Sequence, residues 1–63
     1  MRVNGKTVEF APITLLEYLR REGFDPAHVV VELGRDIITR ECLGAVALGP
    51  EDEINILTFL GGG

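Results

Sequence analysis

Only one stretch of the chain carries a helical pattern, and it is too short to be stable by itself. Thr14 and Glu17 have the spacing of a capping box, which satisfies free backbone donors at a helix start. Gly23 is the residue type expected just after a helix end, and Pro26 forbids continuation. We predict a helix over residues 15–22. Its apolar side chains at helical spacing are Leu15, Leu16, Tyr18 and Leu19. Isolated helices of this length are marginal in water, so this one must pack on a sheet.

Two short runs of alternating apolar and polar residues precede the helix and are joined by Asn4-Gly5. An Asn-Gly pair in this context is a strong hairpin signal, because a type I′ turn requires φ > 0 at both central residues. We predict antiparallel strands over residues 1–4 and 6–10, with Met1 and Val3 on one face.

Strand patterns return after the helix. Residues 29–33 are rich in β-branched side chains and predict a third strand. The pair Gly34-Arg35 permits a tight turn into a short fourth strand over residues 36–40. Residues 41–49 are mixed in character and leave room for a single helical turn.

The last predicted strand, residues 54–60, is the longest and is apolar on both faces. Such a strand usually lies inside a sheet. The order ββαββ predicts an α+β fold, with a mixed sheet of four to five strands and one main helix covering one face. With the last strand beside the first, this is the β-grasp arrangement. We expect one domain over residues 1–60 and a flexible glycine tail over residues 61–63.

The cysteine count and the lengths of the apolar runs indicate the compartment in which the protein is expected to work. Cys42 is the only cysteine among 63 residues, so no disulfide is expected, and the thiol is best explained as a small apolar filler near the core edge. No apolar run approaches the ~18 residues that span a bilayer, and no signal peptide opens the chain. We therefore expect a soluble, cytoplasmic protein that does not act at a membrane.

A net charge of −4 argues against a nucleic-acid partner, whose phosphates need Lys and Arg. The run Glu51-Asp52-Glu53 is either a solvated acidic turn or a docking patch for a basic partner.

The constellations typical of enzymes are missing. His28 is the only histidine, and no pattern sets a nucleophile beside it, so we expect it in a surface loop. There is no CxxC or His pair for a metal site, and no GxGxxG or P-loop for a nucleotide. We expect no catalytic activity, no metal and no stably bound cofactor.

Chemistry is instead expected at the glycine tail, Gly61-Gly62-Gly63. Bare glycine gives a thin tail that can be threaded into the active site of another protein. Its terminal carboxylate has a pKa of about 3.5, so it is ionised and must be activated, normally as an acyl-adenylate made from ATP. The alternative is a frayed terminus or a cloning scar.

The chain resembles the ThiS family of thiamine-biosynthesis sulfur carriers, which have a ubiquitin-like β-grasp fold. The resemblance covers nearly the whole length. It is carried by Asn4-Gly5, by Thr14-Leu15-Leu16, by Val31-Glu32-Leu33 running through Ile37-Ile38-Thr39-Arg40, and by Glu53-Ile54-Asn55-Ile56-Leu57 leading into Phe59-Leu60-Gly61-Gly62-Gly63.

The resemblance implies a mechanism and a set of partners. A ThiF-like adenylyltransferase would use ATP and Mg²⁺ to adenylate Gly63, and a persulfide or sulfide donor would convert the adenylate to a thiocarboxylate. The sulfur would then pass to a ThiG-like thiazole synthase. Gly62 and Gly63 would form the sulfur-carrying C-terminus.

Alternation along the last strand predicts where a partner binds. Ile54, Ile56 and Thr58 share one face, and Asn55, Leu57 and Phe59 share the other. If the Ile face meets the helix, Leu57 and Phe59 form an exposed apolar patch that continues into Leu60 and Gly61 and marks a docking site. Alternatively, Phe59 folds back over the sheet edge and closes the core.

Two other functions remain open at this point. The chain could carry sulfur in another pathway, such as molybdopterin or cysteine synthesis, or act as a protein modifier of the same fold. It could also be a plain β-grasp interaction module with an inert tail, in which case trimming the glycines changes nothing.

Overall fold

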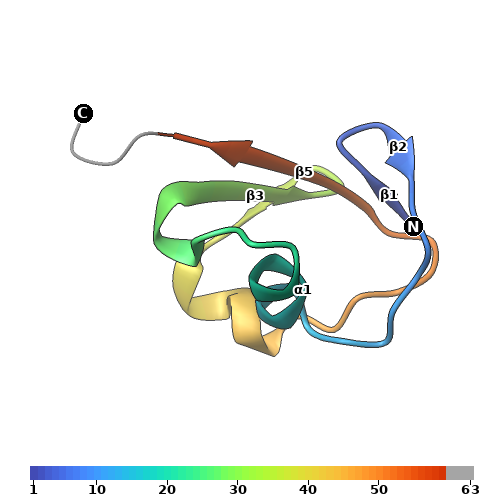
Figure 1. The fold of residues 1–63 in the computed structure, drawn as a ribbon, viewed down its shortest axis with the longest axis horizontal. Helices are drawn as coiled ribbons and strands as arrows, with labels where there is room; N and C mark the ends of the chain where they lie inside the picture. The colour runs from blue at the N-terminus through green and yellow to red at the C-terminus, as the bar shows by residue number, and fades with distance from the viewer. Residues whose placement is uncertain (60–63) are drawn as a thin grey trace.

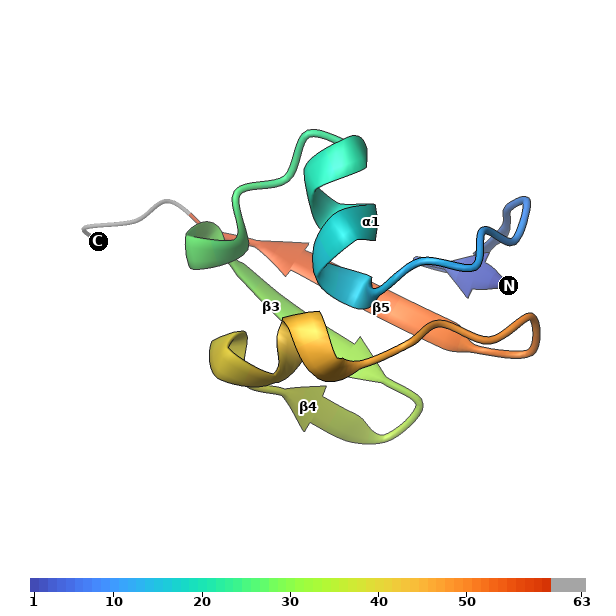
Figure 2. The same cartoon turned by 90° about the horizontal axis from the view of Figure 1, so that it is seen from below.

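A mixed five-stranded sheet carries all of its helices on one face (Figures 1 and 2). The computed structural model describes residues 1–59, so expectations about Leu60 and the three glycines after it lie outside the described residues. The elements in chain order are β1 Arg2–Val3, β2 Lys6–Thr7, α1 Leu15–Arg21, η1 Pro26–His28, β3 Val29–Leu33, β4 Asp36–Ile38, η2 Arg40–Ala45 and β5 Glu53–Thr58, where η denotes a 3₁₀ helix.

The strand order is β2-β1-β5-β3-β4. The last strand lies in the centre, parallel to β1 and antiparallel to β3, and the two outer pairs are antiparallel. Figure 2 shows α1 and η2 side by side in front of this sheet. The predicted α+β β-grasp arrangement, with the last strand beside the first, is confirmed.

The first hairpin turns at Asn4-Gly5, where φ is 52° and 82°. Positive φ at both central residues is the signature of the predicted type I′ turn. The expected strand over residues 6–10 is too long, because β2 ends at Thr7. The Val8 N–H still donates to the Met1 carbonyl at 2.9 Å, after which the chain leaves the sheet to reach α1.

Helix α1 is bounded by the residues that the sequence indicated. The Thr14 hydroxyl oxygen accepts a hydrogen bond from the Glu17 N–H at 3.2 Å, as expected at an N-cap. At the other end Gly23 has φ 86°, and the Phe24 N–H donates to the Leu19 carbonyl at 2.8 Å. This left-handed glycine is the C′ residue of a Schellman motif. The helix ends at Arg21, one residue before the predicted limit.

The second half of the chain follows the predicted order but not all of its limits. Strand β3 has the predicted bounds, and Gly34, with φ 62°, opens the turn into β4. The predicted strand over residues 36–40 is too long, because β4 ends at Ile38 and η2 begins at Arg40. The single helical turn allowed within residues 41–49 is therefore a six-residue 3₁₀ helix that starts earlier.

The core lies between the sheet and its helical layer. The buried side chains are Leu15, Tyr18, Leu19, Val31, Leu43, Leu48, Ile54 and Ile56. The expected packing of Ile54 and Ile56 with the helix residues is confirmed. Cys42 was expected near the core edge, but it is exposed, because its neighbour Leu43 takes the buried position of η2.

No helix within residues 1–59 is both long enough and apolar enough to cross a membrane.

Candidate functional site: the open face of the sheet

Strand β5 separates a buried face from an exposed one, as alternation predicts. Ile54 and Ile56 are 0% and 5% exposed, whereas Leu57 is 62% exposed. The helices cover only the face to which the two isoleucines point (Figure 2). Leu57 therefore lies on the face of the sheet that the described chain leaves open.

The open face is built from cross-strand pairs between β3 and β5. The antiparallel register sets Glu32 opposite Asn55 and Val30 opposite Leu57. One step further, the Phe59 N–H donates to the His28 carbonyl at 3.1 Å, which extends the register beyond both strands. We call these three pairs the open-face ladder; its members are His28, Val30, Glu32, Asn55, Leu57 and Phe59.

The ladder changes character along its length. At one end the Asn55 amide donates to the Glu32 carboxylate at 3.2 Å. Val30 and Leu57 make an apolar pair in the middle. At the other end the His28 and Phe59 rings meet edge to face, with centroids 6.2 Å apart and an interplanar angle of 83°. The apolar and aromatic end thus includes Phe59, the residue that precedes Leu60 in the sequence.

Phe59 does not close the core. Its side chain is 49% exposed, and it lies outside the core cluster. The exposure predicted for Leu57 and Phe59 is therefore confirmed, and the alternative that buried Phe59 over the sheet edge is wrong. Binding of a partner by these residues stays a prediction.

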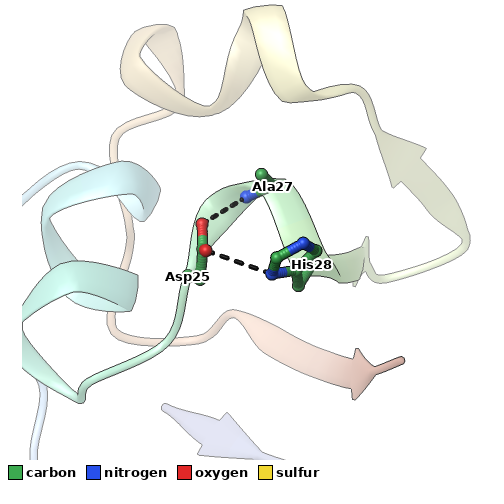
Figure 3. Close-up of polar contacts among 3 residues, drawn as sticks. All are labelled: Asp25, Ala27 and His28. Atoms are coloured by element: carbon green, nitrogen blue, oxygen red, sulfur yellow. Dashed lines mark hydrogen bonds and ion pairs between the residues drawn. The ribbon is translucent and has the colours of Figure 1, made fainter. Parts of the chain in front are cut away.

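His28 sits at the end of η1 rather than in a loop, and its side chain is half-exposed. Asp25 supports it from the start of the same short helix. One Asp25 carboxylate oxygen accepts from the Ala27 N–H at 2.9 Å, and the other lies 3.1 Å from His28 Nδ1 (Figure 3). The pair Asp25-Pro26, an N-cap residue followed by proline at N1, was the sequence signal that could have located this helix.

Ile37 is a second residue of this face that sequence patterns did not single out. It lies on β4, opposite Glu32, and is 66% exposed. Because directly paired residues share a face of a sheet, Ile37 adds an exposed apolar side chain on β4 beside Glu32, at the polar end of the open-face ladder.

Asp52, the central residue of the acidic run, stabilises a turn and is more than a solvated charge. The Asp52 carboxylate accepts from the Gly49 N–H at 2.7 Å and so closes the turn before β5. Glu51 and Glu53 are exposed. The docking role considered for this run stays a prediction for these two residues.

The remaining predicted site residues, Leu60, Gly61, Gly62 and Gly63, lie outside the described residues. Within residues 1–59 there is no pocket and no group of three or more side chains placed to hold a metal ion.

Comparison with known proteins supplies the family. No family model matches the chain. A crystal structure of the thiamine biosynthesis protein ThiS from Geobacter metallireducens is 33% identical, with a TM-score of 0.76 over 98% of this chain and 96% of that one. A solution structure of a thiamine biosynthesis protein from the same organism gives 33% identity and a TM-score of 0.77 over 98% and 85%.

A thiazole synthase from Magnetococcus marinus is 40% identical over 64 residues, which cover 100% of this chain but 20% of that protein. The chain thus spans about a fifth of the length of this curated relative. The structural matches extend over 98% of this chain and over 96% and 85% of the other two chains, with TM-scores that indicate the same fold. The chain belongs to the ThiS family of thiamine-biosynthesis proteins, with the ubiquitin-like β-grasp fold.

Proposed function

We propose that the chain is a sulfur carrier whose terminal glycine, Gly63, is adenylated and converted to a thiocarboxylate that donates sulfur for thiazole formation. The observation that carries this proposal is the match to ThiS, at 33% identity over 98% of the chain. The three glycines at positions 61–63 supply a group suited to that chemistry.

The chemistry needs only one group from this chain. The Gly63 carboxylate attacks the α-phosphorus of ATP, and pyrophosphate leaves. The acyl-adenylate is an electrophile, so sulfide displaces AMP at the carbonyl carbon and leaves the thiocarboxylate. A persulfide donor also displaces AMP but leaves an acyl disulfide, and a second thiol then releases the thiocarboxylate by forming a disulfide with the donor sulfur. Glycine suits this step because no Cβ hinders the approach to that carbon. The adenylyltransferase supplies ATP and Mg²⁺ binding, so the carrier is its substrate and not itself an enzyme.

The open-face ladder is the proposed docking surface for a ThiF-like adenylyltransferase. Leu57 and Phe59 are exposed large apolar side chains beside Val30, which is also partly exposed. A contiguous apolar patch of this kind usually marks a binding site. Leu60 and Gly61 follow Phe59 directly in sequence, so docking here brings the tail to the enzyme.

A ThiG-like thiazole synthase is the proposed acceptor of the sulfur. The support is the Magnetococcus marinus thiazole synthase, in which a segment similar to this whole chain occurs within a longer polypeptide. This favours the thiazole branch over molybdopterin or cysteine synthesis. We expect sulfur transfer to take place in the cytoplasm, where a lone thiol such as Cys42 stays reduced.

ATP–pyrophosphate exchange tests the proposal at its first chemical step. The host's adenylyltransferase, mixed with the full chain, is expected to exchange labelled pyrophosphate into ATP. The same enzyme mixed with a chain lacking Gly63 is expected to give no exchange. Equal exchange with the two chains would overturn the assignment of the reactive group to Gly63.

A further inference from the structure

Phe59 is held in place by His28, the last residue of η1, rather than by the core. Strand β5 ends at Thr58, so Phe59 is the first residue after it. Two contacts fix it there: its N–H donates to the His28 carbonyl at 3.1 Å, and its ring meets the His28 ring edge to face at 6.2 Å. Edge-to-face packing at this distance is a favourable geometry for aromatic pairs.

The His28 ring is in turn held by Asp25. His28 Nδ1 lies 3.1 Å from one Asp25 oxygen, and the other oxygen caps the Ala27 N–H at 2.9 Å (Figure 3). Each Asp25 carboxylate oxygen therefore makes one contact, and rotation of the carboxylate would break at least one of them. The contact between His28 Nδ1 and the Asp25 carboxylate is an ion pair when the imidazole is protonated.

A half-exposed side chain outside the core ordinarily samples several rotamers. The contacts of Phe59 with the ring and the backbone carbonyl of His28 act against that freedom. We propose that His28 is a positioning residue: it orients Phe59 for the activating enzyme, and it acts through Phe59 rather than through any contact with the reacting carboxylate. This inference rests on the proposed function, since it names what organises the docking surface of the carrier.

The kinetic test compares His28→Ala with His28→Phe in adenylation of the full chain. His28→Ala is expected to raise the KM for the carrier by about threefold to tenfold, the range that loss of one aromatic pair corresponds to, with kcat unchanged. His28→Phe keeps an aromatic edge against Phe59 and is expected to restore most of the loss. Arg20→Ala, on the exposed side of α1, is the matched control and should leave KM unchanged.

A double-mutant cycle separates positioning from a direct contact with the enzyme. If His28 acts through Phe59, adding His28→Ala to Phe59→Ala gives no further rise in KM. Additive effects would contradict the proposal, and so would a lowered kcat. The urea midpoint of His28→Ala should fall by no more than the loss of one aromatic pair accounts for, and a cooperative transition with an unchanged slope rules out a general loss of structure.

A measurement that does not involve the enzyme keeps this inference distinct from the proposed function. NMR couplings of Phe59 should show one dominant χ1 rotamer in the wild type and in His28→Phe, and averaging in His28→Ala. Averaging in the wild type would overturn the positioning role even if adenylation proceeds normally. A single rotamer lost in His28→Ala, together with no adenylation of any variant, would uphold the positioning of Phe59 and reject the proposed function.

Discussion

Asn4 performs two structural tasks, of which the sequence pattern indicated only one. Its positive φ was foreseen from the Asn-Gly turn signal, because that signal is local. Its side-chain oxygen also accepts from the Ile56 N–H at 2.7 Å, a partner fifty-two positions away. No local pattern announces such a bond, since it depends on β1 and β5 lying side by side. The same limit concealed the His28–Phe59 contact, which depends on β3 and β5 lying side by side.

The two tasks of Asn4 can be separated by substitution. Asn4→Gly keeps the freedom to adopt positive φ and loses only the hydrogen bond, so we expect it to lower the free energy of unfolding by about 1–2 kcal/mol. Asn4→Ala also incurs the left-handed backbone cost and should lower it by about 2–4 kcal/mol. Urea denaturation measures both. Equal losses in the two variants would show that backbone conformation at this position is unimportant.

Tyr18 gives the stability a pH dependence. Burial raises the pKa of its hydroxyl above the ordinary 10.0, the Glu22 carboxylate adds to the rise, and Arg21 opposes it. The fold therefore prefers the protonated hydroxyl. This contribution is fully present below the ordinary pKa and is lost as the pH rises through the folded-state value, because the unfolded chain releases its proton first.

The measurement is urea unfolding of the wild type and Tyr18→Phe across the alkaline range. The free energy of unfolding of the wild type should fall more steeply above the ordinary tyrosine pKa than that of the variant. Other titrating groups affect both proteins alike and cancel in the difference. A difference that stays constant with pH would show that the Tyr18 hydroxyl titrates as freely in the fold as in the unfolded chain.

At the scale of elements, faces were easier to predict than ends. Alternation correctly assigned Ile54 and Ile56 to the core and Leu57 to the surface, because it is a property of the strand itself. The predicted ends of β2 and β4 lie too late in the chain, because the end of a strand depends on the path of the next segment. Strand β2 stops where the chain must cross to α1, and β4 stops where η2 begins.

Neighbouring positions on β5 offer a matched pair of substitutions. Ile56→Ala removes a buried side chain and is expected to lower the free energy of unfolding by about 2–5 kcal/mol. Leu57→Ala changes an exposed one and should stay within about 0.5 kcal/mol of the wild type. Thermal or urea unfolding measures both, and a large stability loss in Leu57→Ala would contradict the exposure of this face.

Substitutions on the open face should affect binding of the adenylyltransferase more than they affect folding stability. Under the docking proposal, Phe59→Ala weakens the complex with the adenylyltransferase by about 2 kcal/mol, as for an aromatic hot spot, with little change in folding stability. Calorimetric titration of the enzyme with the folded variants measures this. A loss of about 3–5 kcal/mol of stability in Phe59→Ala would instead mark Phe59 as a core residue.

For the whole molecule, one face of the sheet is covered by the helices and the other is open within residues 1–59. The helical layer covers the first face (Figures 1 and 2), and the open-face ladder with Ile37 occupies the second. The order of elements was predictable because each carries a strong local signal. The site was predictable only in part. The alternating pattern of the last strand predicted that Leu57 and Phe59 are exposed. That Val30, Ile37 and His28 lie on the same face depends on strand order and register.

The central claim is that Gly63 carries sulfur, and intact mass spectrometry tests it most directly. The full chain is incubated with ATP, Mg²⁺, sulfide and an adenylyltransferase from the same host whose activity is verified separately. The account predicts an ATP-dependent exchange of one oxygen for one sulfur on the peptide that holds Gly61, Gly62 and Gly63. A chain lacking Gly62 and Gly63 should show no exchange while keeping its stability within about 0.5 kcal/mol. An unchanged mass, or sulfur found on Cys42 instead of the terminal glycine, would contradict the claim.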